Sequence, residues 1–227
     1  MIILRSFNII LRGLINVFFT PHRYRSDYMM SLGMGFGSRR QLKSLPWMNY
    51  KVIDYLERRI SPGFKVFEYG SGSSTRYWIS QGCFVISIEH DSDFYYNNKD
   101  EIGAGCDYFL VEPDLADAQS LKSPESPDSF VSIDYQGFSF ERYVKTIDNF
   151  PDEYFDMVVV DGRARPSCIK RALKKVAPNG IILLDNSDRI YYLSETKYLL
   201  SDWKRIDFRG AVRGLAHFEQ TSIFQRS

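Results

Sequence analysis

The sequence predicts an α/β fold in which a doubly wound, mostly parallel sheet carries helices on both faces, and three observations lead to this prediction. First, short apolar runs without polar alternation are typical of strands buried on both faces, and they recur at 65–69, 84–89, 107–111, 155–160 and 180–184. Second, stretches with helical spacing separate most of these runs, at 74–81, 92–101, 140–149 and 167–177. Third, no internal repeat and no second core is visible, so one domain accounts for these elements.

An apolar segment, residues 2–19, opens the chain, and its polar residues recur every three to four positions. Arg5, Asn8, Arg12 and Asn16 would form one narrow stripe along a helix. No uninterrupted apolar run reaches the roughly 18 residues of a membrane span, and a basic leader with a small-residue cleavage site is missing. Two interpretations of this amphipathic helix stay open: it packs on the domain or in a dimer contact, or it lies peripherally on a membrane.

The next segment, residues 20–40, mixes Pro, Gly, Ser and Arg and predicts an irregular linker or lid. Apolar residues then return at helical spacing from Leu42 to Ile60, and Ser61-Pro62-Gly63 ends this helix. We therefore divide the chain into an N-terminal helix with its linker, residues 1–41, and a main domain, residues 42–227.

Two later segments depart from the regular alternation. Residues 112–139 are rich in Pro, Ser and Asp and predict no regular element; a connection of this length is either functional or locally disordered. The tail contains two β-like pieces, 203–208 and 220–225, around a loop that contains glycine. Antiparallel pairing of these pieces would close one edge of the sheet.

Composition excludes several classes of protein. The formal net charge is +1 and the basic residues are scattered, so we expect no nucleic-acid partner. The three cysteines, Cys83, Cys106 and Cys168, stand far apart without C-x-x-C spacing. Such a sparse, odd set argues against a disulfide framework and a zinc site and favours a reducing compartment, so the predicted location is the cytoplasm, with membrane association left open.

The first predicted strand ends in a glycine turn, Glu68-Tyr69-Gly70-Ser71-Gly72, and the second ends in a carboxylate, Glu89. Glycines let the backbone turn sharply beside a ligand, and an acid at the second strand can accept the ribose hydroxyls of an adenosine. This pattern occurs in both NAD-binding and adenosylmethionine-binding folds. Two details favour the second: Thr75 replaces the third glycine of G-x-G-x-x-G, and the Glu68 carboxylate suits a cationic cofactor better than a pyrophosphate.

The sequence resembles the class I, seven-stranded Rossmann-like, S-adenosylmethionine-dependent methyltransferase superfamily over about residues 42–227. The similarity lies in four motifs in the family's order: E-Y-G-S-G-S-S at 68–74, I-E-H-D at 88–91, F-D-M-V-V-V-D-G at 155–162 and P-N-G-I-I-L-L-D-N at 178–186. The resemblance implies the strand order 3-2-1-4-5-7-6 with strand 7 antiparallel, which agrees with the two β-like pieces of the tail. It also implies S-adenosyl-L-methionine as the cofactor.

Candidate site residues follow from the glycine turn, the ribose-binding acid and these motifs. For cofactor binding they are Glu68, Gly70, Ser71, Gly72, Ser73, Glu89, His90 and Asp161. For catalysis, which needs an aligned acceptor and a general base, they are Asp161, Arg163 and Asp185, because they stand where the fourth and fifth strands end. Trp47, in the preceding helix, belongs either to the core or to a substrate wall.

A metal is a further hypothesis, because Asp161, Asp185 and Asn186 match the oxygen-ligand positions of metal-dependent catechol-type O-methyltransferases, and such ligands suit Mg²⁺. These enzymes carry a lysine three residues after the first ligand, where this chain has Ala164; Arg163 or Arg165 would have to serve as the cation. The alternatives are that the two aspartates cap helices or organise loops, and that the arginines clamp an anionic acceptor.

The sequence thus predicts an enzyme, a methyltransferase that acts on a small molecule and favours a hydroxyl oxygen. The preference for oxygen rests only on the partial match at Asp161, Asp185 and Asn186. Two other functions stay open: a non-catalytic adenosyl-ligand-binding or scaffolding protein, and an NAD-dependent oxidoreductase.

Overall fold

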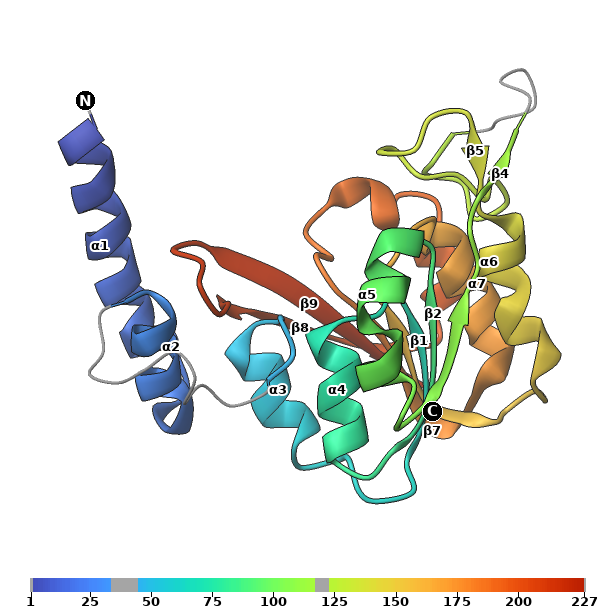
Figure 1. The fold of residues 1–227 in the computed structure, drawn as a ribbon, viewed down its shortest axis with the longest axis horizontal. Coiled ribbons are helices and arrows are strands. Elements are labelled where there is room, and N and C mark those ends of the chain that lie inside the picture. The colour runs from blue at the N-terminus through green and yellow to red at the C-terminus, as the bar shows by residue number, and fades with distance from the viewer. Residues whose placement is uncertain (1, 34–44, 117–122, 227) are drawn as a thin grey trace.

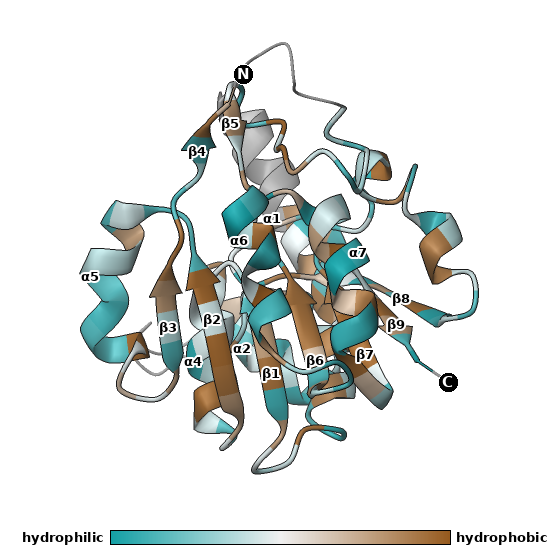
Figure 2. Ribbon diagram, turned by 90° about the vertical axis from the view of Figure 1, so that its right-hand side faces the viewer, coloured by the Kyte–Doolittle hydropathy of each residue, from teal (hydrophilic) through white to brown (hydrophobic). Residues whose placement is uncertain are grey.

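The seven long strands form one sheet in the order β3-β2-β1-β6-β7-β9-β8. The computed structural model describes residues 2–33, 45–116 and 123–226, with side chains from residue 11 onward. Neighbouring strands are parallel from β3 to β7, whereas β9 runs antiparallel to both β7 and β8. This confirms the predicted order 3-2-1-4-5-7-6 and the antiparallel last strand, and Figure 2 shows the strands side by side in this sequence.

The strands lie where the apolar runs predict them. Their bounds are β1 Lys65–Tyr69, β2 Phe84–Glu89, β3 Asp107–Leu110, β6 Phe155–Val160, β7 Val176–Leu184, β8 Lys204–Ala211 and β9 Phe218–Gln225. The central strands are the most hydrophobic part of the ribbon in Figure 2, because both of their faces are covered.

Helices form a layer on each side of the sheet, and neighbouring residues of a strand face opposite layers. On one side, α6 (Glu141–Lys145), the short helix η3 (Thr146–Asn149) and α7 (Arg165–Lys175) pack on Phe67. On the other, α3 (Tyr50–Leu56) and α4 (Ser73–Ser80) pack on Val66. Helix α5 (Ser92–Ile102) follows β2 and contacts β2 and β3. The doubly wound architecture is therefore confirmed.

The helix predicted from Leu42 to Ile60 is shorter than expected. Leu45 and Met48 are buried but not helical, and α3 begins only at Tyr50 because Asn49 caps it, accepting from the amide of Val52 at 3.1 Å. The amide of Asn49 also donates to the carbonyl of Phe208. These contacts to the far edge of the sheet hold residue 49 in extended backbone and prevent an earlier helix start.

The predicted irregular linker, residues 20–40, is also wrong in its described part. A short helix η1 (His22–Tyr24) leads into α2 (Arg25–Ser31), and the rings of Tyr24 and Tyr28 are buried in the same core as α3. The Tyr28 hydroxyl donates to the carbonyl of Leu215 at 2.8 Å. Burial of two tyrosines outweighs the weak local helix preference. Residues 34–44, with the predicted division at 41, lie outside the described residues, and that division stays a prediction.

Helix α1 (Ile2–Phe19) precedes these elements and projects beside the sheet, as the blue helix of Figure 1. At the other end of the molecule, the segment 112–139 is bracketed by a small antiparallel pair, β4 (Asp114–Leu115) and β5 (Phe138–Ser139). Two short helices, η4 (Ile190–Tyr192) and η5 (Lys197–Leu200), lie between β7 and β8. Residues 117–122 lie outside the described part of the chain.

Candidate functional site

The glycine turn after β1 lies directly against the end of β6. Gly70 has a φ of 90°, and a Cβ placed on it would come 2.8 Å from the Cα of Gly162. A Cβ on Gly162 would in turn lie 2.0 Å from the Tyr143 hydroxyl. Both residues must therefore be glycine, because no side chain fits between the two strand ends. Gly162 was not among the predicted site residues, although it directly follows Asp161 in the strand motif.

Glu68 is fully buried beneath this turn and does not line the cavity described below. Its carboxylate accepts hydrogen bonds from Thr75 Oγ1, Trp78 Nε1 and Ser87 Oγ, the last two at 3.0 Å. Burial raises the pKa of Glu68, and these hydrogen bonds act in the opposite sense. Glu68 therefore connects β1, α4 and β2 through hydrogen bonds below the turn. The residue that replaces the third glycine, Thr75, is one of its partners.

Glu89 connects the end of β2 to the same turn. One carboxylate oxygen accepts from the amide and the hydroxyl of Ser71, at 3.1 and 2.7 Å. The other accepts from the amides of His90 and Asp91, at 2.7 and 3.0 Å. Burial alone would raise the pKa of Glu89, but these hydrogen bonds and the His90 ring lower it to about 2. Glu89 is therefore an ionised side chain held next to Ser71, with the Tyr108 hydroxyl also 2.7 Å from the Ser71 hydroxyl.

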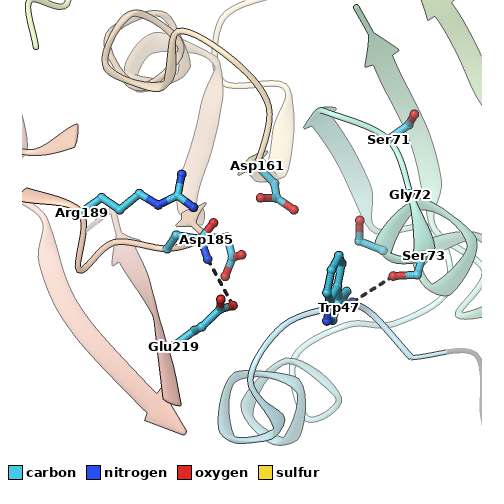
Figure 3. A pocket seen from close by; sticks show the side chains of 10 residues that line it. Trp47, Ser71, Gly72, Ser73, Asp161, Asp185, Arg189 and Glu219 are labelled. Atoms are coloured by element: carbon cyan, nitrogen blue, oxygen red, sulfur yellow. Dashed lines mark hydrogen bonds between the residues drawn. The ribbon is translucent and has the colours of Figure 1, made fainter. Parts of the chain in front are cut away.

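A polar cavity of about 330 Å³ opens at the carboxyl ends of β1, β6 and β7. Figure 3 shows its two walls: the glycine turn and Trp47 on one side, and the ends of β6, β7 and β9 on the other. The lining residues are Trp47, Ser71, Gly72, Ser73, Ser74, Asp161, Asp185, Asn186, Arg189 and Glu219. Parallel α/β sheets bind ligands at this edge, where the strand order reverses.

Trp47 belongs to the cavity wall rather than to the core, since its side chain is 62% exposed. Its backbone amide donates to Ser73 Oγ at 2.9 Å, and its indole Nε1 donates to the carbonyl of Arg213 at 3.0 Å. These two bonds tie the start of α4 to the hairpin between β8 and β9.

The structure brings Asp161, Asp185 and Asn186 together on the opposite wall, around the buried guanidinium of Arg165. Arg165 donates to a carboxylate oxygen of Asp161 at 3.0 Å, to the carbonyl of Asp185 at 2.6 Å and to Oδ1 of Asn186 at 3.4 Å. A second cation among these three residues would lie beside a positive charge. Within the described residues, no group of three or more His, Cys, Asp or Glu side chains could hold a metal ion. Because Arg165 already donates to carboxylate and amide oxygens of Asp161 and Asn186 that Mg²⁺ would need, this arrangement of the donors does not fit Mg²⁺.

The carboxylates of this wall influence one another. Burial is the main cause that raises the pKa of Asp161, followed by the nearby charge of Asp185. Burial also raises the pKa of Asp185, and the charge of Glu219 adds to this effect, whereas Arg165 and the Thr221 hydroxyl act against it. The pKa of Asp161 reaches about 8, so at neutral pH this carboxyl group retains a proton that an isolated one would have lost.

Arg163 and His90 point elsewhere, toward the segment 112–139. Arg163 forms an ion pair with Asp134 at 2.8 Å, and its Nε lies 3.3 Å from His90 Nε2. The Tyr135 hydroxyl lies 3.1 Å from the same His90 nitrogen. Neither Arg163 nor His90 lines the cavity; the lining arginine is Arg189, from the loop after β7, and Arg165 lies behind the wall, paired with Asp161.

No protein-family model and no curated protein matches the sequence. Solved structures do match. An O-methyltransferase from Bacillus cereus, determined in complex with SAH, is 14% identical and covers 88% of this chain and 87% of its own, with a TM-score of 0.53. A methyltransferase from Geobacter sulfurreducens is 14% identical over 83% of each chain, with a TM-score of 0.48. At this identity the likeness is one of fold. The chain has the class I methyltransferase fold.

Within this methyltransferase fold, three features of the polar wall were missed by the sequence: Glu219, Thr221 and Arg189. Glu219 accepts from the Asn186 amide at 3.2 Å, and the Thr221 hydroxyl donates to Asp185 at 2.6 Å. Both stand on β9, more than 30 residues after their partners. The predicted antiparallel strand 7 could have pointed to Glu219 and Thr221, because a strand inserted beside β7 brings its own residues next to the end of β7.

Proposed function

We propose that this protein is an S-adenosylmethionine-dependent methyltransferase that transfers a methyl group to the hydroxyl oxygen of a small molecule. The observation that carries the proposal is the charge of the cavity. Three carboxylates line it, those of Asp161, Asp185 and Glu219, against a single lining arginine, Arg189. A ligand that enters between the glycine turn and these acids meets an excess of negative charge.

Such a cavity suits a cationic donor. S-adenosylmethionine carries a sulfonium and an ammonium group, and an opposite charge lowers the pKa of a carboxyl group beside it. Burial raises the pKas of Asp161 and Asp185 although the nearby charge of Arg165 acts against it, and a cationic donor would lower both pKas further. A dinucleotide would bring a negatively charged pyrophosphate to the same wall, which argues against the NAD alternative.

In this proposal the two walls of the cavity have different roles: one binds the methyl donor and the other activates the acceptor. We assign the donor to the turn at Ser71–Ser74, which Glu89 supports from behind by accepting from the Ser71 amide, and Asp161 faces this turn across the cavity (Figure 3). When bound, S-adenosylmethionine supplies an electrophilic methyl group. The chain's own residues must then orient the acceptor, exclude water and remove the acceptor proton.

Asp185 is the proposed general base. Thr221 donates to its carboxylate and Arg165 to its backbone carbonyl, which fixes its position at the cavity, where it would take the proton of the acceptor hydroxyl. Burial raises the pKa of Asp185, and a carboxylate with a raised pKa is a stronger proton acceptor than an ordinary one. Arg165 supplies the resident positive charge of this wall, so we propose that the reaction needs no divalent metal.

Isothermal titration tests the donor site. We expect S-adenosylmethionine to bind with release of protons at pH 7 to 8, seen as a heat that depends on the ionisation enthalpy of the buffer. The variant Asp161→Asn should weaken this binding about tenfold or more, and should weaken adenosylhomocysteine, which lacks the sulfonium charge, much less. Asp134→Asn removes a carboxylate outside the cavity and is the matched control. Absence of binding to both ligands would refute the proposal.

Turnover tests the base. With a panel of hydroxylated small molecules and labelled donor, Asp185→Asn should lower kcat by about 10²- to 10⁴-fold while donor affinity changes little. A chelator should leave the activity of the wild type unchanged. Loss of activity that Mg²⁺ restores would overturn the metal-free mechanism. Donor binding without turnover of any acceptor class would support the non-catalytic alternative instead.

A further inference from the structure

Helix α1 packs on the domain through a narrow side that includes the polar residue Asn16 together with Val17. In its described part, Gly13, Asn16 and Thr20 at its end are buried, and the Asn16 amide donates to the Tyr28 hydroxyl at 3.1 Å. The Thr20 hydroxyl donates to the carbonyl of Asn16 at 2.9 Å. The narrow polar stripe of the sequence therefore serves, at Asn16, as the contact to the domain. An ordinary surface helix has the opposite orientation.

The apolar residues of the same helix face outward. Phe18 is 77% exposed and Ile15 is 47% exposed, and the set of exposed large apolar side chains on α1 is Leu11, Leu14, Ile15, Phe18 and Phe19. Of these, Phe19 has a ring contact with Phe218 on β9. Helix α1 contacts α2 and β8, and among the described residues the other apolar side chains of this face stay exposed. A contiguous apolar face of this kind indicates a binding surface.

The charge around this face has one sign. Residues 1–26 contain no aspartate and no glutamate, and they contain four arginines: Arg5, Arg12, Arg23 and Arg25. Arg12 is exposed among the apolar residues of α1.

We propose that α1 docks in the plane of an anionic membrane surface, with its apolar face in the headgroup region and Arg12 beside acidic lipid headgroups. An apolar face with arginines at its border is the composition of interfacial helices, which bind by apolar burial together with attraction to anionic lipid. None of the described helices is long and apolar enough to cross a bilayer. A second copy of this chain would cover the apolar face as well, but it would bring two sets of arginines together.

Vesicle sedimentation with the full chain tests the proposal. We expect the wild type to sediment with vesicles of phosphatidylglycerol and phosphatidylcholine, and at least about tenfold less with phosphatidylcholine alone. The double variant Leu14→Ser/Phe18→Ser should lose most of this binding. These positions are chosen because their side chains are exposed, whereas Phe19 contacts β9. Arg12→Gln should weaken binding to the anionic vesicles alone.

Phe84→Ser is the matched control, because Phe84 is an equally exposed phenylalanine, at 70%, on the far end of β2. It should bind vesicles like the wild type, and circular dichroism and thermal melting should show that all variants are folded. Failure of the wild type to bind anionic vesicles, or equal binding to both vesicle types, would overturn the proposal. So would a dimer, seen by sedimentation equilibrium, that the double variant abolishes while vesicle binding persists.

Discussion

Replacing Glu89 by glutamine removes a charge that the fold holds in place with four hydrogen bonds. The pKa of Glu89 is about 2, against an ordinary value of 4.5. Since each tenfold change in acidity corresponds to about 1.36 kcal/mol, the ionised side chain contributes about 3 kcal/mol to folding at neutral pH. Its pKa is lowered on folding, so this contribution is present above pH 4.5 and is lost as the pH falls toward 2. About 2 kcal/mol of it disappears between pH 7 and pH 3.

Urea unfolding of the wild type and of Glu89→Gln at both pH values measures this effect. We expect the variant to be less stable by about 3 kcal/mol at pH 7, and the difference between the two proteins to shrink by about 2 kcal/mol at pH 3. Glu101→Gln removes a glutamate from an exposed ion pair with Arg76 and should change stability by less than about 1 kcal/mol at either pH. A difference that is the same at pH 7 and pH 3 would show that Glu89 acts by shape and not by charge.

Three other substitutions probe the site's framework by urea unfolding. Gly162→Ala should lower the free energy of unfolding by about 1–3 kcal/mol or more, because the added methyl group meets the Tyr143 hydroxyl. Gly72→Ala has open space around it and should change stability little. Equal effects of the two substitutions would contradict the close contact at Gly162. Arg165→Lys keeps the charge but loses most of the guanidinium hydrogen bonds, so we expect a loss of about 3 kcal/mol, and a loss below about 1 kcal/mol would refute this role. Asn49→Ala should cost about 1–2 kcal/mol through the lost helix cap, and an unchanged midpoint would show that the cap is replaced by water.

Apolar runs were sufficient to predict most strands of the sheet, because buried parallel strands leave a strong signal in a short window, whereas the strand order followed from the resemblance to class I methyltransferases. The helix start at Tyr50 was not predictable in this way, since it depends on bonds from Asn49 to Phe208, far along the chain. The same holds for Tyr24 and Tyr28, whose burial makes helices of a segment that contains turn-forming residues.

In the candidate site, too, some positions were predictable from the sequence and others were not. The sequence placed Asp161 and Asp185 correctly at the strand ends, because the carboxyl ends of parallel strands meet at one edge. It could not place the side chain of Arg163, which turns toward Asp134. It also could not distinguish a metal from the guanidinium of Arg165, since both would satisfy the same oxygen atoms and only the packing of α7 decides between them.

The position of β9 between β7 and β8 has a consequence for synthesis of the protein. A chain leaves the ribosome from its N-terminus, so the cavity wall that is built from residues 69–89 is translated well before β9. Asp185 cannot gain its hydroxyl partner until Thr221 has been translated. The nascent chain therefore carries the wall of Ser71–Ser74 long before Glu219, and the cavity is complete only after β9 has been translated.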